Sequence, residues 1–183
     1  FAAPLAAPIR PRLTAARRPL EVPGRPVRWI PGAQCHLTLK FLGEIPELSV
    51  VELLSEAEPR LARSPAFSLT VAGTGVFPSW ERPRAVWAGV TEGREELEKL
   101  AEILEDLARE FSFRAEEHRF RPHVTVGRVK HLPWRERAQW AALAGREFGR
   151  QTVDRVVLYR SELAPEGPEY TVLGTLRLEG NQT

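Results

Sequence analysis

The sequence predicts an α+β fold, or at its broadest an α/β one, from three observations. The chain has 183 residues, within the roughly 100–200 that a single domain usually occupies. Hydrophobic residues make up 43% and charged residues 27%, values that exclude disordered and collagen-like chains. Some segments alternate apolar and polar residues, and others repeat apolar residues at helical spacing. We therefore expect short strands interleaved with about four helices around one core.

The clearest single element is a helix over residues 94–111, where apolar residues form one continuous stripe and charged residues cover the other face. A loop rich in proline and glycine over 22–32 is followed by a strand over 35–43, which a glycine ends. The other expected elements are an opening strand and short helix, a helix over 49–63, strands over 67–73, 85–90 and 119–129, a helix over 134–144, and closing strands over 154–163 and 170–178.

Composition also limits the compartment and the partners. Cys35 is the single cysteine, which excludes an intramolecular disulfide and fits a reducing compartment. No apolar run reaches the roughly 18 residues of a membrane helix. The opening residues also lack the uninterrupted apolar stretch of a signal peptide, so we expect a cytoplasmic protein. The net charge is only +2, but 23 of the 26 basic residues are arginine, whose planar guanidinium suits phosphate.

One four-residue pattern occurs twice in the chain. The sequences HLTL at 36–39 and HVTV at 123–126 share the form His-x-Thr-apolar, and each lies on an expected strand. Each is followed, after a loop, by an expected helix, and the two copies are almost half the chain apart. The simplest explanation is an internal duplication. We therefore expect one domain over residues 1–183, made of two related lobes that each contribute one motif strand.

The repeated pattern places an imidazole and a hydroxyl side by side. Side chains alternate between the faces of a strand, so His36 shares a face with Thr38, and His123 shares one with Thr125. If the strands are neighbours, one imidazole can donate a proton to a reacting group while the other accepts one. In-line displacement at phosphorus needs that arrangement, and hydroxyls can hydrogen-bond to its non-bridging oxygens. The pattern therefore predicts phosphoester chemistry that requires no metal and no cofactor.

The same alternation places the other side chains of the first motif strand. Cys35 and Phe41 are expected on the core face, and Lys40 on the polar face beside His36. A buried cysteine that points away from the imidazole is expected to be inert rather than a nucleophile.

Two other uses of residues in this chain need to be weighed. A zinc site is the sharpest alternative role for paired histidines, but it needs three or four ligands, and His118 and His131 show no ligand-like spacing. Among the aromatic residues, Trp80 lies in an arginine-rich loop and is the candidate for stacking on an RNA base.

The two motifs resemble the signatures of a known family. The segments HLTLKFLG at 36–43 and PHVTVGR at 122–128 are similar to the paired motifs of the two-histidine (2H) phosphoesterases. The block GTGVFPSWERPRAVWAGV at 73–90 and the closing LYRSEL and GPEY are similar to the bacterial and archaeal 2′-5′ RNA ligases. These are also described as RNA 2′,3′-cyclic phosphodiesterases. The resemblance runs along nearly the whole chain.

This resemblance implies a fold and a role for each motif residue. The implied fold is a bilobal α+β one, with two antiparallel sheets backed by helices and an active site in the cleft between the lobes. His36 matches the histidine that protonates the leaving oxygen, and His123 matches the base that activates water. Thr38 and Thr125 match the threonines that hold the phosphate.

An arginine completes the set that the resemblance implies. Arg128 matches an arginine that follows the second motif and contacts the substrate phosphate. By strict alternation it falls on the core face, so it reaches the cleft only if the strand bends or bulges near Gly127. Arg119 and Arg121 share the parity of His123, and they could steer RNA or simply be solvated at a strand end.

The implied reaction is the opening of a terminal RNA 2′,3′-cyclic phosphate to a 2′-phosphomonoester, with a related 2′-5′ ligase activity. Its expected partners are RNAs with such ends, including tRNA fragments, and the chain is expected to be a monomer with no membrane partner. A same-fold alternative is a phosphodiesterase of small cyclic nucleotides or of 2′-5′ oligonucleotides. A different class, an RNA-end-binding module that has lost turnover, is disfavoured because all four motif residues are present.

Overall fold

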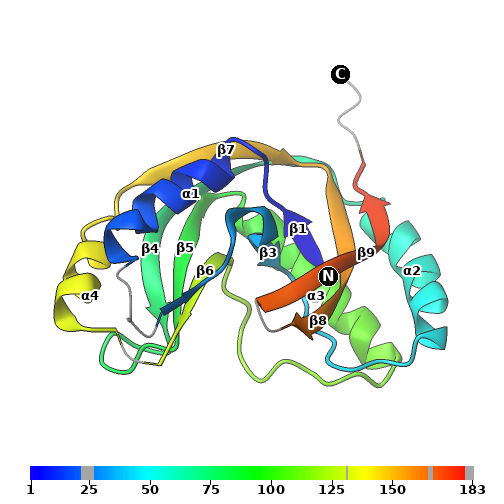
Figure 1. The fold of residues 1–183 in the computed structure, drawn as a ribbon. Coiled ribbons are helices and arrows are strands. Elements are labelled where there is room, and N and C mark those ends of the chain that lie inside the picture. Colours follow the sequence, from blue (N-terminus) through cyan, green and yellow to red (C-terminus); the bar gives the residue numbers. More distant parts are fainter. Residues whose placement is uncertain (22–26, 131, 165–166, 180–183) are drawn as a thin grey trace.

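The computed structural model describes residues 1–21, 27–130, 132–164 and 167–179. In these ranges nine strands form one curved antiparallel sheet in the order β7-β4-β5-β6-β3-β1-β8-β9, with β2 paired to β6 (Figure 1). The strands are β1 (Ala2–Pro4), β2 (Val27–Trp29), β3 (His36–Thr38), β4 (Phe67–Phe77), β5 (Ala85–Glu92), β6 (His123–Val129), β7 (Glu147–Val153), β8 (Arg155–Ala164) and β9 (Gly167–Arg177).

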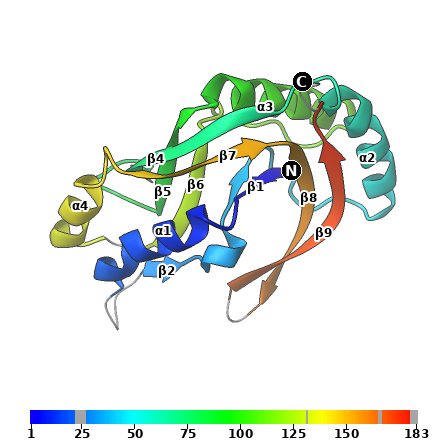
Figure 2. The same ribbon diagram turned by 90° about the horizontal axis from the view of Figure 1, so that it is seen from above.

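Helices pack near both ends of this sheet (Figure 2). Helices α1 and α4 contact β7 and β4, whereas α2 contacts β9 and packs against α3. The predicted apolar stripe of α3 is confirmed, because its leucines and alanines from Leu97 to Ala108 are buried. The helices are α1 (Ile9–Arg17), α2 (Leu48–Leu61), α3 (Arg94–Glu110) and α4 (Trp134–Ala141), with short 3-10 helices at Arg18–Leu20 and Gly32–Gln34. No helix in the described part of the chain has the length and apolarity to cross a membrane.

The predicted α+β class and antiparallel pairing are confirmed, but the expectation of two separate sheets is wrong. Strands β3 and β6 pair directly through Leu37 and Val124, so the sheet is continuous across its centre. Pairing these strands leaves neither as an open edge, which would otherwise expose unpaired backbone groups. Three strands follow outward from each motif strand in the sheet order. The two-lobed duplication stays a prediction.

The first motif strand is shorter than expected, and two side chains that follow it therefore differ from the prediction in their burial. Strand β3 ends at Thr38, so the pleat no longer dictates which way the following residues point. Phe41, expected on the core face, is 68% exposed. Lys40, expected on the polar face, is 2% exposed. Its Nζ lies 2.6 Å from Glu105 Oε2 on α3 and donates to the carbonyl of Arg114 at 2.9 Å.

Other differences lie where the sequence signals were weak. Strand β2 forms inside the stretch expected to be a loop, whose residues 22–26 lie outside the described ranges. It pairs with β6, so tertiary pairing overrides the local proline and glycine signal. Strand β4 continues to Phe77, well into the expected loop, because β5 pairs with it along that length.

Candidate active site

The pairing of β3 with β6 brings the two motifs together. Leu37 pairs with Val124 in antiparallel register, and both side chains are fully buried. The residues on either side of each therefore face the opposite surface of the sheet. These neighbours are the four motif residues His36, Thr38, His123 and Thr125, all of them half-buried.

The register determines how these four side chains, called here the motif square, lie relative to one another. It puts His36 opposite Thr125 and Thr38 opposite His123. Directly opposed side chains have Cβ atoms about 4.5–5.5 Å apart, and diagonal neighbours are about 7–8 Å apart. The two imidazoles therefore occupy one diagonal of the square and the two hydroxyls the other. A small tetrahedral group between the imidazoles would meet both hydroxyls.

Both imidazoles are held by the same backbone contact. His36 Nδ1 lies 2.9 Å from the carbonyl oxygen of Gln34, and His123 Nδ1 lies 2.6 Å from the carbonyl oxygen of Arg121. A carbonyl oxygen only accepts, so Nδ1 is the donor in each case. In the neutral ring Nε2 then carries the free lone pair, and in the charged ring it carries the second proton. In each ring Nε2 is the atom left to exchange a proton with a ligand.

Burial lowers the pKa of both histidines below the ordinary value of 6.5. The hydrogen bond to the backbone carbonyl opposes this effect in each case, because it favours the charged ring. For His123 the positive charges of Arg128 and Arg121 lower the pKa further. Both imidazoles are therefore biased towards the neutral form in the free protein, and a bound anion would favour the charged form.

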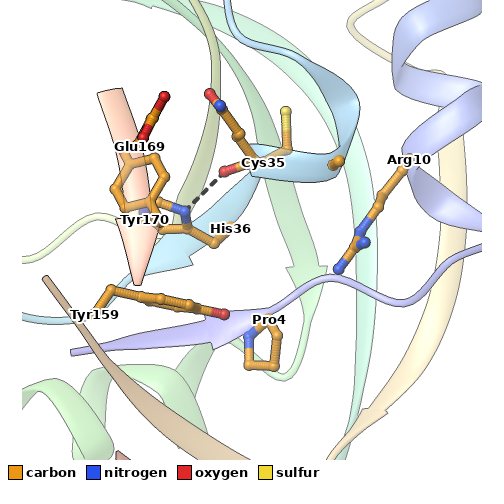
Figure 3. Close-up of a pocket in the computed structure, with 9 residues that line it drawn as sticks. Pro4, Arg10, Cys35, His36, Tyr159, Glu169 and Tyr170 are labelled. Carbon is orange, nitrogen blue, oxygen red and sulfur yellow. Dashed lines mark hydrogen bonds between the residues drawn. The ribbon is translucent and has the colours of Figure 1, made fainter. Parts of the chain in front are cut away.

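His36 borders a cavity of about 330 Å³. Its ring makes an edge contact with Tyr170 at 4.8 Å between centroids and a tilted one with Tyr159 at 5.6 Å (Figure 3). The side chains of Arg10 and Glu169 also line this cavity. Burial raises the pKa of Tyr159, so its hydroxyl stays protonated. The cavity thus offers aromatic faces together with one cationic and one anionic group.

The surroundings of His123 are different. Its ring makes an edge contact with Phe77 at 4.8 Å between centroids, and Trp87 lies beyond at 6.3 Å. The guanidinium of Arg121 lies over the Phe77 ring at 5.2 Å. This side of the motif square is packed by aromatic rings and bordered by positive charge.

A bulge in β6 brings Arg128 to the face of the motif square. Val86 pairs with Gly127 but Trp87 pairs with Thr125, so β6 carries one extra residue at this point. The extra residue reverses the alternation, and Arg128 is exposed while Val129 is buried. Its charge acts on the pKa of His123, which agrees with a position on the same side. Arg28 on β2 pairs directly with Arg128 and is also exposed, although no sequence signal pointed to it.

The remaining candidates lie apart from the motif square. Cys35 is buried and unpaired as expected, and burial raises the pKa of its thiol. Trp80 is half-buried against the hydrophobic core, and no ring contact joins it to either histidine in the described structure. Arg119 forms an ion pair with Glu98 at 3.2 Å, and His118 is exposed. His131 lies outside the described residues, and no described group of three His, Cys, Asp or Glu side chains could hold a metal ion.

Comparison with known proteins shows which family has this arrangement. A family model described as the 2′-5′ RNA ligase superfamily matches residues 6–164, which include the whole motif square. The chain belongs to the 2′-5′ RNA ligase superfamily. Among curated members, a Thermotoga maritima protein named RNA 2′,3′-cyclic phosphodiesterase is 37% identical over 159 residues, covering 83% of this chain and 80% of that protein. A Thermus thermophilus protein of the same name is 40% identical over 166 residues, covering 85% and 79%.

Solved structures extend the superfamily match to the fold. The crystal structure of TT0787 from Thermus thermophilus superposes with a TM-score of 0.83 at 31% identity, covering 99% of this chain and 97% of that one. E. coli LigT complexed with 3′-AMP superposes with a TM-score of 0.77 at 28% identity, covering 97% and 95%. The expected family and the α+β fold class are therefore confirmed.

Sequence reasoning missed several residues that border the site. Tyr170 and Arg10 come from the last strand and the first helix, and only the folded sheet brings them to His36. Arg28 lies on the strand that was expected to be a loop. The sequence did contain one signal for Arg10, its regular four-residue spacing with Thr14 and Arg18. That spacing alone does not indicate a function.

Proposed function

We propose that this chain opens RNA 2′,3′-cyclic phosphate ends to 2′-phosphomonoesters by two-histidine acid/base catalysis, without a metal. The observation that carries the proposal is the register of β3 and β6, which puts two imidazoles on one diagonal and two hydroxyls on the other. Curated relatives named RNA 2′,3′-cyclic phosphodiesterase support the choice of substrate. A relative crystallised with 3′-AMP supports a site that accepts a nucleoside phosphate.

In the proposed step, Nε2 of neutral His123 takes a proton from water as its oxygen attacks phosphorus. The bond from phosphorus to O3′ breaks in line with the attack, and Nε2 of protonated His36 donates a proton to O3′. The P–O2′ bond stays intact, so the product is a 2′-phosphomonoester. Thr38 and Thr125 donate hydrogen bonds to the non-bridging oxygens, where negative charge grows, and Arg128 neutralises part of that charge. A 5′-hydroxyl in place of water would give a 2′-5′ linkage by the same displacement.

The test is hydrolysis of a short RNA that ends in a 2′,3′-cyclic phosphate, in excess chelator. We expect a 2′-phosphate end, identified by phosphorus NMR and by its migration against synthetic 2′- and 3′-phosphate standards. His118→Ala is the matched control, because that imidazole is exposed and lies outside the motif square. A 3′-phosphate product, or turnover only after a divalent metal is added, would contradict the proposal.

Small cyclic nucleotides and 2′-5′ oligonucleotides serve as comparison substrates in the same assay. Turnover of one of these without turnover of the RNA end would favour the alternative activity. Binding of the RNA end with no turnover of any substrate would favour the binding module. The tRNA-fragment substrate, the monomeric state and the cytoplasmic location stay predictions.

A further inference from the structure

Two arginines, Arg10 on helix α1 and Arg18 in the 3-10 helix that follows it, line a second cavity next to the one beside His36. This second cavity has a volume of about 490 Å³ and is lined by Arg10, Thr14 and Arg18 on one side and by Gly32 and Ala33 on the other. Arg10 and Ala33 line both cavities, so the two cavities adjoin each other, and together they are called here the depression. Its wall is close-fitting at one point, where a Cβ on Gly32 would lie 2.9 Å from Thr14 Oγ1.

The sequence of α1 explains this cationic lining. Residues four apart share one face of a helix, so Arg10 and Thr14 line up, and Arg18 continues the row just past the end of the helix. Ile9 and Leu13, on the face directed at the sheet, are buried. The helix contains no acidic residue that could neutralise the row from within.

The two arginines of the row are free to bind an anion. Arg17, their neighbour, is used by the fold itself: it forms an ion pair with Glu21 at 2.7 Å and donates to the carbonyl of Ile30. The Arg10 side chain, by contrast, makes no hydrogen bond in the described part of the chain, and it lines both cavities. No ion pair to Arg10 or Arg18 occurs in the described part of the chain. A phosphate in the cavity would give these two guanidinium groups an anionic acceptor, which no described side chain supplies.

The proposed reaction predicts which part of the substrate lies in this depression. Because His36 protonates O3′, the terminal ribose lies on the His36 side of the motif square. The same ribose carries the base and, through C5′, the rest of the RNA chain. Tyr159 and Tyr170 offer the faces on which a base can stack, whereas Arg10 offers charge. The tyrosines therefore suit the base, and the arginine suits the upstream phosphate.

We propose that Arg10 and Arg18 form a subsite for the phosphodiester immediately 5′ of the terminal nucleotide. This inference rests on the proposed function and adds a specificity to it. The enzyme then prefers an oligonucleotide with a cyclic phosphate end over a mononucleotide 2′,3′-cyclic phosphate. The preference comes from the upstream charge rather than from the reacting group.

The test compares three substrates with the full chain. They are adenosine 2′,3′-cyclic phosphate, the dinucleotide that carries the same end, and that dinucleotide with a neutral methylphosphonate linkage. We expect kcat/KM to be at least about tenfold higher for the natural dinucleotide than for either of the others. Arg10→Ala and Arg18→Ala should each reduce the ratio of dinucleotide to mononucleotide kcat/KM by about tenfold. Arg10→Lys should retain part of the preference, because the charge remains without the planar fork.

Arg12→Ala is the matched control. Arg12 is exposed on the same helix, but it lies near Gly149 of β7 and lines neither cavity. It should leave the ratio unchanged. Equal kcat/KM for all three substrates, or an equal loss on both natural substrates in the arginine variants, would overturn the subsite while leaving the proposed function intact. Failure of the wild-type protein to hydrolyse any of the three would instead remove the proposed function.

Discussion

The two motif strands carry the same pattern, but they meet different surroundings. In both, Nδ1 of the histidine bonds to the carbonyl two residues earlier, so each ring is oriented by its own backbone. His36 lies on a three-residue strand, with Tyr159 and Tyr170 beside a cavity. His123 lies on a seven-residue strand and packs against Phe77.

Charge differs between the two sides as well. Arg121 and Arg128 both act on the pKa of His123, whereas no side-chain charge acts comparably on His36 among the causes of its pKa shift. The comparison teaches that the repeated pattern orients the two imidazoles, while neighbouring elements make the two halves of the site unequal. The proposed reaction assigns the role of acid to His36, beside the cavity, and the role of base to His123, beside Arg121 and Arg128.

The largest expected effect is the loss of either imidazole. His36→Ala and His123→Ala should each reduce kcat by about 10³-fold, within the usual range for a general acid or base. The double variant should lose little more than either single one, because the two act in the same step. Single-turnover rates measure the effect, and circular dichroism confirms that the fold is retained.

A sulfur-substituted substrate can distinguish the two roles. A cyclic phosphate with sulfur in place of the bridging 3′ oxygen releases a thiolate, which leaves without a proton. This substrate should restore most of the rate of His36→Ala and little of that of His123→Ala. Rescue of His123→Ala instead would reverse the assignment of acid and base.

The threonines should show a smaller and more even effect. Thr38→Ala and Thr125→Ala should each cost about 2–3 kcal/mol of transition-state stabilisation, a loss near 10²-fold in kcat. The two losses should be similar, since the hydroxyls occupy equivalent corners of the motif square. Thr→Ser at either position keeps the hydroxyl and should restore most of the rate. No loss in the alanine variants would exclude a direct role at phosphorus.

Replacing Arg128 tests whether the positive charge beside His123 contributes to substrate binding. Arg128→Ala should raise KM for the cyclic phosphate by about tenfold, because one charge-assisted contact is lost. Arg119→Ala is the control, since its guanidinium is paired with Glu98. An equal change in both variants would indicate general attraction of RNA rather than a contact at the phosphate.

The smallest expected effect is on the pH dependence. Because burial lowers the pKa of both imidazoles below 6.5, the fall in kcat/KM on the alkaline side should begin below that pH, as His36 loses its proton. On the acid side it should fall as His123 becomes protonated. The profile of kcat should lie at higher pH, since the bound anion favours the charged rings.

The variant Arg128→Ala sharpens this prediction. Removing that charge should raise the pKa of His123 and move the acid limb of kcat/KM to higher pH, with the alkaline limb unchanged. The measurement is kcat/KM from about pH 4.5 to about pH 9, roughly two units on either side of an ordinary imidazole pKa. A rate that rises steadily to the alkaline end would contradict the assignment of His36 as the general acid.

Much of the site could be predicted from the sequence, because its key information is local. Alternation along two short strands was enough to put each histidine beside its threonine, and the repeat indicated that the pairs belong together. Alternation failed beyond Thr38, because β3 ends there and Phe41 is exposed to solvent. Lys40 became buried because α3 and the loop that follows it supply its partners.

The parts that could not be predicted depend on contacts between distant segments. Alternation alone could not decide the position of Arg128, because the bulge is a property of the pairing between β5 and β6. Strand β2 was missed because the prolines and glycines on either side of it carry a loop signal that the pairing overrides. Arg10 and Tyr170 join His36 from nearly opposite ends of the chain.

The order of strands in the sheet also has a consequence for synthesis on the ribosome. Strand β1 lies between β3 and β8, and Ala2 pairs with Val157, so this half of the sheet closes only when the last hairpin is present. Pairings between such distant segments form slowly, because the long intervening chain must first be ordered. A nascent chain that stops before Arg155 already carries all four motif residues, but it lacks the tyrosines that pack on His36. We therefore expect activity to appear only near the end of translation, so that truncated products remain inert towards RNA.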